Sequence, residues 1–167
     1  PAAIIPRPET ETLVELVLAF CGSRGSSDRL RIVDVGVGCG AIAVALAVGL
    51  PQAAVIAVDI SAETLALARR NAERHGVAER IGFREGDLLA PLAAHPEPVL
   101  SPAEGPVEGP AHPEPKPGVS RDSSRRADVI VANLPYVATA DFDQSPPEIR
   151  DHEPRLGLDG GPDGLRL

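Results

Sequence analysis

The apolar residues of this chain fall into short runs separated by glycine, proline and polar residues, and four of these runs predict β-strands. They are residues 31–35, 53–58, 81–87 and 127–132. The first two are rich in β-branched side chains, which favour strands over helices. Runs of this length, bounded by turn-forming residues, are typical of strands.

Apolar residues spaced three or four positions apart predict helices between these strands. Residues 41–48 are almost wholly apolar and predict a buried helix. Another helix is predicted over residues 62–74, with Ser61 as its N-cap and Gly76 as the left-handed residue that ends it. Its shared apolar face consists of Leu65, Ala68 and Ala72. Because strands that alternate with helices need parallel crossovers, the predicted fold class is α/β, with a doubly wound, mostly parallel sheet.

We predict one domain over residues 1–167, because a chain of 167 residues can bury one core and has no room for a second domain of any size. An amphipathic helix over residues 9–21, with Thr10 available as its cap, precedes the first strand. Residues 91–126 hold half of the chain's 18 prolines and few large apolar side chains. We interpret this segment as a disordered insertion; a docking tail for a proline-recognising domain is the alternative.

Charge and cysteine content exclude several classes of function. The net charge of −8 disfavours a nucleic acid partner, which needs clustered Lys and Arg. The 2 cysteines form no CxxC pair, so we expect neither a disulfide framework nor a metal site. Without an apolar run of membrane-spanning length or a signal pattern, we expect a cytoplasmic protein with no membrane contact.

The glycine-rich segment 36–40 follows a predicted strand and opens a predicted helix, which is where open α/β sheets bind ligands. Asp59 follows nineteen residues after Gly40, at the end of the next strand, where an acid can bind both hydroxyls of a ribose. The GxGxG spacing favours S-adenosylmethionine over a dinucleotide, whose loop reads GxGxxG. In methyltransferases that this sequence resembles, an acid at the position of Asp34 lies near the amino-acid end of the cofactor. The alternative is a glycine turn that only packs a helix on a strand.

The third predicted strand ends at Asp87 and Leu88, on the same edge of the sheet. There an acid can meet an adenine amino group while Leu88 packs against the ring; a solvated Asp that caps a turn is the alternative. The predicted cofactor-binding residues are Asp34, Gly36, Val37, Gly38, Cys39, Gly40, Asp59, Ile60, Asp87, Leu88 and Asn133.

The segment Asn133-Leu134-Pro135-Tyr136 follows the fourth predicted strand and resembles the Asn-Pro-Pro-Tyr tetrapeptide of amino-methyltransferases. These enzymes act on a planar nitrogen, either a glutamine amide or the exocyclic amine of adenine. The resemblance implies that the Asn133 side chain and the Leu134 carbonyl accept hydrogen bonds from this nitrogen and that Tyr136 stacks on the flat group. A turn that only ends the strand is the alternative reading of the tetrapeptide.

Residues 5–11, 147–155 and 158–165 resemble the segments that flank this motif in the PrmC/HemK family, the release factor glutamine methyltransferases. The resemblance implies a Rossmann-like class I methyltransferase core that transfers a methyl group from S-adenosylmethionine to a glutamine side-chain amide. The substrate that it implies is a peptide chain release factor with a Gly-Gly-Gln motif. An N6-adenine methyltransferase acting on RNA or DNA, or a non-catalytic cofactor-binding fragment, is the alternative function.

The chain departs from the family pattern at its motif and at its ends. Leu134 replaces the usual first proline, although the backbone carbonyl is kept and Pro135 still restrains Leu134 to extended angles. We expect a chain truncated at both ends, with a sheet incomplete at the C-terminus, since it has no methionine and stops as a new element begins. We expect His152 to be structural, whereas the roles of Arg7 and Glu9 stay open between the acceptor pocket and a helix cap.

Overall fold

The computed structural model describes residues 3–23, 30–94 and 127–166. At its centre is a sheet of four parallel strands in the order β3-β2-β1-β4. The strands are β1 (Arg31–Val35), β2 (Ala54–Asp59), β3 (Ile81–Glu85) and β4 (Val129–Ala132). The predicted parallel α/β sheet is therefore confirmed, with β3 and β4 each two residues shorter than the runs that predicted them.

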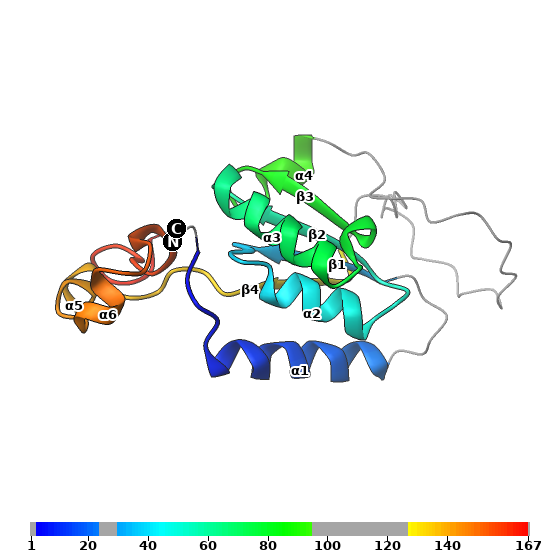
Figure 1. Ribbon diagram of the computed structural model, residues 1–167, viewed down its shortest axis with the longest axis horizontal. Helices are drawn as coiled ribbons and strands as arrows, with labels where there is room; N and C mark the ends of the chain where they lie inside the picture. The colour runs from blue at the N-terminus through cyan, green and yellow to red at the C-terminus, as the bar shows by residue number, and fades with distance from the viewer. Residues whose placement is uncertain (1–2, 24–29, 95–126, 167) are drawn as a thin grey trace, which may run out of the picture.

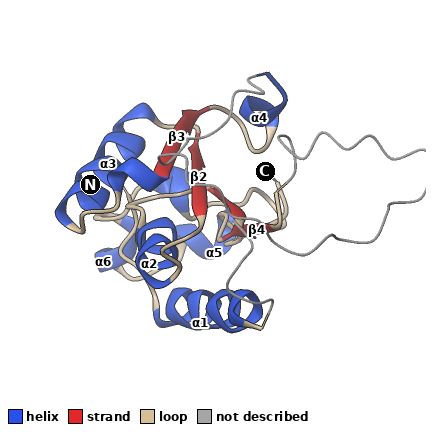
Figure 2. Ribbon diagram, turned by 90° about the vertical axis from the view of Figure 1, so that its right-hand side faces the viewer, coloured by secondary structure: helices blue, strands red, loops and turns tan. Residues whose placement is uncertain are grey.

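Three helices cover one face of the sheet (Figures 1 and 2). They are α1 (Pro8–Gly22), α2 (Ala41–Gly49) and α3 (Ala62–Arg74). Apolar side chains from all three helices join residues of all four strands in one buried cluster. Since a helix buries one apolar stripe against a sheet, this cluster accounts for the apolar spacing that predicted the helices. None of the helices among the described residues is long and apolar enough to cross a membrane.

A smaller cluster lies on the opposite face, where Val33, Val35 and Val58 pack with Leu92 of the short helix α4 (Ala90–Ala94). This helix corrects the prediction of disorder over 91–126 at its first four residues. Pro91 is tolerated in the first helical turn, and Leu92 gains apolar contacts with the sheet. Residues 95–126, the rest of the predicted insertion, lie outside the described residues.

The helix caps confirm two predictions and correct a third. The Ser61 hydroxyl accepts a hydrogen bond from the Thr64 N–H at 3.3 Å, and Gly76 has a φ of +67° just beyond α3. Thr10 is not the cap of α1. The N-cap is Arg7, which has an extended backbone, and its carbonyl accepts a hydrogen bond from the Thr10 N–H at 2.9 Å. Thr10 thus lies in the first turn with its side chain buried.

Beyond the carboxyl ends of the strands, the chain after β4 folds into short helices and turns (Figure 1). Val137 bridges Asp159, and Arg155 stacks on the Phe142 ring while pairing with Asp159 at 2.7 Å. These contacts hold residues 137–159 together beyond the strand ends. The short elements are α5 (Thr139–Asp143), α6 (Pro147–Arg150) and η3 (Arg155–Gly157), while η1 (Ala78–Arg80) precedes β3.

Candidate functional site

The glycine loop that leaves β1 is held close to β2, β4 and α3. The N–H groups of Gly36 and Val37 donate to the Val58 carbonyl at 2.8 and 3.0 Å. Gly36 and Gly40 have φ of +72° and +88°, which L side chains rarely adopt. A Cβ on Gly36 would lie 2.8 Å from a Leu134 methyl group, so the loop passes directly beneath the predicted acceptor motif.

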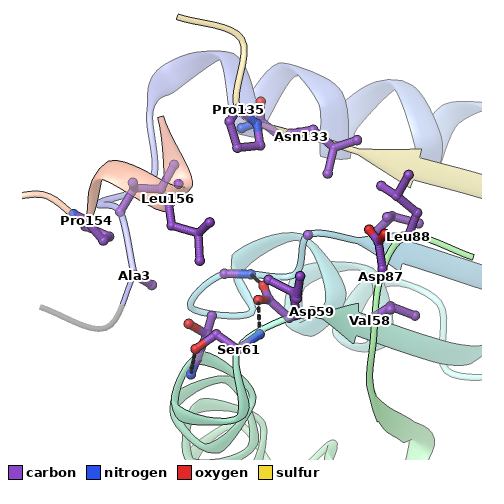
Figure 3. A pocket seen from close by; sticks show the side chains of 18 of the residues that line it. Ala3, Val58, Asp59, Ser61, Asp87, Leu88, Asn133, Pro135, Pro154 and Leu156 are labelled. Carbon is purple, nitrogen blue, oxygen red and sulfur yellow. Dashed lines mark hydrogen bonds between the residues drawn. The ribbon is translucent and has the colours of Figure 1, made fainter. Parts of the chain in front are cut away.

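The carboxylate of Asp59, at the end of β2, is oriented by two backbone donors (Figure 3). Its Oδ2 accepts from the Gly38 N–H and its Oδ1 from the Ser61 N–H, both at 3.0 Å. A carboxylate oxygen has a second lone pair, so each can still accept from a ligand hydroxyl. The loop and the cap of α3 therefore present Asp59 as a fixed pair of acceptors, as a ribose requires.

A pocket of about 400 Å³ opens beside Asp59, between the strand ends and the segment after β4 (Figure 3). Its volume lies in the range of small-molecule sites. It brings together residues predicted for the cofactor and for the acceptor. The predicted residues that line it are Gly36, Gly38, Asp59, Ile60, Asp87, Leu88, Asn133, Leu134 and Pro135.

The remaining predicted residues lie outside the lining: Asp34, Val37, Cys39, Gly40 and Tyr136. Tyr136 is 68% exposed, and the Cys39 carbonyl accepts a hydrogen bond from the Asn71 side chain at 2.8 Å. Five of the predicted residues are therefore not part of the pocket surface.

Asp34 is fully buried behind this loop. Desolvation raises the pKa of its carboxyl to about 7, the Ala43 N–H opposes this, and the negative charge of Asp59 adds to it. Its Oδ2 accepts from the Ala43 N–H at 3.0 Å, whereas its Oδ1 has no hydrogen-bond partner. Asp34 therefore ties the first turn of α2 to β1.

Several lining residues were not predicted from the sequence. Ser61, Glu63 and Thr64 come from the start of α3, and their signal was the helix cap next to Asp59. Others come from both ends of the described chain, within or next to the flanking segments that carried the resemblance. These are Ala3, Ile4, Pro154, Leu156, Gly157, Asp159 and Arg166.

The two flanking segments are joined by an ion pair between Arg7 and Glu153. The Glu153 side chain is only 5% exposed, and its Oε2 has no hydrogen-bond partner. Arg7 therefore holds the segment after α6 against the start of α1, and neither Arg7 nor Glu9 lines the pocket. His152 is exposed and lies outside the lining as well.

Acidic side chains outnumber basic ones in the lining, which favours a ligand with positive charge. The lining includes the acidic residues Asp59, Glu63, Asp87 and Asp159 and the basic residue Arg166, and Asp159 is paired with Arg155. Among the described residues, no three His, Cys, Asp or Glu side chains gather in a way that could hold a metal ion.

Asn133 stands where β4 ends and the pocket begins. It is half-buried, and its Nδ2 donates to the Thr10 hydroxyl of α1 at 3.4 Å. Across the pocket lies Asp59, so one cavity contains a ribose-type acceptor pair and an amide suited to a planar nitrogen (Figure 3).

Comparison with known proteins agrees with this geometry. Residues 32–99 match the family described as a methyltransferase domain. Over 99% of the chain, it is 40% identical to the release factor glutamine methyltransferase of Geobacter sulfurreducens and 38% identical to that of Gloeobacter violaceus. Over almost its whole length, the chain is therefore similar to release factor glutamine methyltransferases. The resemblance predicted from residues 5–11, 133–136, 147–155 and 158–165 is thereby confirmed.

The chain spans 45% and 46% of the length of these two homologues. Among solved structures, it is similar to an RNA methyltransferase from Salinibacter ruber in complex with S-adenosyl-L-homocysteine. That likeness has 29% identity over 52% of each chain and a TM-score of 0.41. Because the two sequence relatives are matched over 99% of this chain, the match includes both the glycine loop and the predicted acceptor motif.

Proposed function

We propose that this chain transfers a methyl group from S-adenosylmethionine to the side-chain amide nitrogen of a glutamine in a protein. One observation carries the proposal: Asp59 and Asn133 line the same pocket, one suited to a ribose and the other to a planar amide. The high identity to release factor glutamine methyltransferases supports the same reaction.

The pocket fits the proposed cofactor. The two Asp59 oxygens are oriented for a vicinal diol, and Leu88 offers an apolar surface beside Asp87 for a purine. The acidic lining suits the positive charge that a sulfonium brings. Gly36 and Gly38 leave the backbone free of side chains on the side that faces the pocket. When bound, S-adenosylmethionine supplies an electrophilic methyl group attached to sulfur.

The acceptor residues have the harder task, because an amide nitrogen is a poor nucleophile whose lone pair is delocalised into its carbonyl. Asn133 Oδ1 and the Leu134 carbonyl oxygen accept hydrogen bonds from the two N–H groups of the glutamine amide. This holds the nitrogen toward the methyl group and draws electron density back onto it as positive charge develops. Leu134 keeps the backbone acceptor that proline would provide at this position.

The proton balance needs no dedicated base. The carbon–sulfur bond breaks as the nitrogen–carbon bond forms, and the N-methylated amide then carries a positive charge that makes its N–H strongly acidic. Asn133 Oδ1 holds that N–H, from which the proton passes to water. The exposed His152 lies outside the pocket lining and has no part in this proposal.

We further propose a peptide chain release factor as the substrate, modified in its Gly-Gly-Gln motif, and therefore action in the cytoplasm. The names of the homologues support the release factor, and the family resemblance supports the motif. The net charge of −8 disfavours the adenine alternative, since nucleic acid would be repelled.

The test uses the natural full-length protein with radiolabelled S-adenosylmethionine and three acceptors: a release factor, the same factor with Ala in place of its Gly-Gly-Gln glutamine, and total RNA and DNA. Label in the first acceptor alone supports the proposal. Label in nucleic acid would overturn it in favour of the adenine methyltransferase. Binding of S-adenosylhomocysteine without transfer to any acceptor would favour the alternative of a non-catalytic, cofactor-binding protein.

A further inference from the structure

Helix α1 reaches the acceptor end of the pocket through the buried hydroxyl of Thr10. Thr10 is 7% exposed, and its Oγ1 accepts the hydrogen bond from Asn133 Nδ2 across a separation of 123 positions. Figure 3 shows α1 passing behind Asn133 and Pro135. Because the N-cap of α1 is Arg7, the Thr10 side chain is not used to begin the helix and is available to Asn133.

In the structure this contact directs Nδ2 of the Asn133 amide toward α1. A side-chain amide has two donors on Nδ2 and an acceptor at Oδ1, and a half-turn about its last bond exchanges them. The amide nitrogen of a glutamine substrate offers only N–H donors, so Nδ2 turned toward it would place donor against donor. With Nδ2 bound to Thr10, Oδ1 is the end left for the substrate.

We propose that Thr10 is a positioning residue that holds Asn133 with its Oδ1 toward the nitrogen to be methylated. The proposal rests on the proposed function for its catalytic consequence, although the orientation itself can be measured without a substrate. The side chain suits this task because it is fixed in the first turn of a helix and buried, and a buried hydroxyl needs a hydrogen-bond partner. Fixed orientation of this kind saves reorganisation during the reaction.

The first experiment compares Thr10→Val, which keeps the shape and removes the hydroxyl, with Thr10→Ser, which keeps the hydroxyl. Val17→Ala is the matched control, because Val17 is buried in α1 and packs in the core rather than against Asn133. We expect Thr10→Val to lower kcat about tenfold with the cofactor Kd changed less than about threefold. Thr10→Ser should restore the rate, and Val17→Ala should lower only the Tm.

A double-mutant cycle then asks whether Thr10 acts through Asn133. In an Asn133→Ala background, Thr10→Val should cause no further loss of kcat, because the group that it positions is already absent. Full additivity of the two losses would overturn the proposal. Equal losses in Thr10→Val and Val17→Ala, measured where both are folded, would do the same by showing that Thr10 acts through helix stability. If Thr10→Val does not fold, Thr10→Ala takes its place in the cycle.

A readout without substrate separates this proposal from the proposed function. In the ¹⁵N-labelled protein, Thr10→Val should shift the Asn133 side-chain amide resonances and speed their exchange with water, while Thr10→Ser and Val17→Ala leave them in place. If glutamine is not methylated but these resonances respond, the proposed function fails and the positioning stands. If glutamine is methylated and Thr10→Val acts at the parent rate with unshifted resonances, the positioning fails alone.

Discussion

The two halves of the pocket are built in different ways. The proposed cofactor half comes from short, local turns, in which the glycine loop leaves β1 and Asp59 ends the neighbouring β2, both tied by backbone hydrogen bonds. The proposed acceptor half contains Asn133, and the lining is completed by residues near the start of the chain and between 154 and 166. Local construction should make the first half tolerant of changes elsewhere, whereas the second half depends on contacts between distant segments.

Asp34 lies beneath the cofactor half and is the position where the largest change in stability is expected. Its pKa is raised from 3.8 to about 7 by burial, so its contribution to stability is complete below the unfolded pKa and is lost as pH rises through the folded pKa. The parent protein should lose a few kcal/mol in its free energy of unfolding between pH 4 and 7, and this loss should be absent in Asp34→Asn. Denaturant titrations at a series of pH values measure it, and parallel curves for the two proteins would contradict the buried-acid account.

Asn133→Ala should show most clearly that the two halves have different tasks, because it should change methyl transfer and not cofactor binding. Without the side-chain acceptor, methyl transfer should fall about a hundredfold or more, by analogy with loss of one preorganised hydrogen-bonding group. Cofactor affinity should change little, because Asp59 and the glycine loop remain. Single-turnover methylation beside calorimetric binding of S-adenosylhomocysteine measures both. Transfer at the parent rate would show that the acceptor site lies elsewhere.

Asp59→Ala should give the opposite result. Removing both oxygens takes away the proposed ribose acceptors and also leaves the Gly38 and Ser61 N–H groups without partners. Cofactor Kd should rise about tenfold or more, while the single-turnover rate at saturating cofactor falls less. Asp59→Asn, which keeps one acceptor, is the control and should lie between the two. Unchanged Kd in Asp59→Ala would remove the ribose assignment.

Gly36→Ala should affect both halves of the pocket, and its effect should be the smallest of the four substitutions. Both Gly36 and Gly76 have positive φ, but only at Gly36 does a Cβ meet another side chain, that of Leu134 at 2.8 Å. Each substitution should cost about 1–2 kcal/mol of stability from backbone strain. Gly36→Ala should also displace Leu134 and reduce transfer several-fold, whereas Gly76→Ala should leave transfer unchanged. Thermal unfolding measures the backbone strain in both variants, and single-turnover rates measure the displacement of Leu134.

Local patterns in the sequence predicted the elements of the cofactor half. Residues 31–35 form β1 and 62–74 form α3 as predicted, because periodicity, the Ser61 cap and glycine turns act over a few residues. The prediction for Thr10 was wrong for a related reason. A hydroxyl near a helix start satisfies the cap pattern, but Arg7 begins the helix one turn earlier and leaves Thr10 inside it.

By itself, the sequence determined the α/β order, the glycine loop with Asp59, and the acceptor motif, since each is carried by neighbouring residues. Only the tertiary structure decided that Asp34 is buried with an unpartnered oxygen, that residues 154–166 close the pocket, and that Thr10 holds Asn133. The physical reason is that burial and contacts between distant residues depend on how whole elements pack. Thr10 and Asn133 are separated by 123 positions in the sequence, so no local pattern of residues could predict their hydrogen bond.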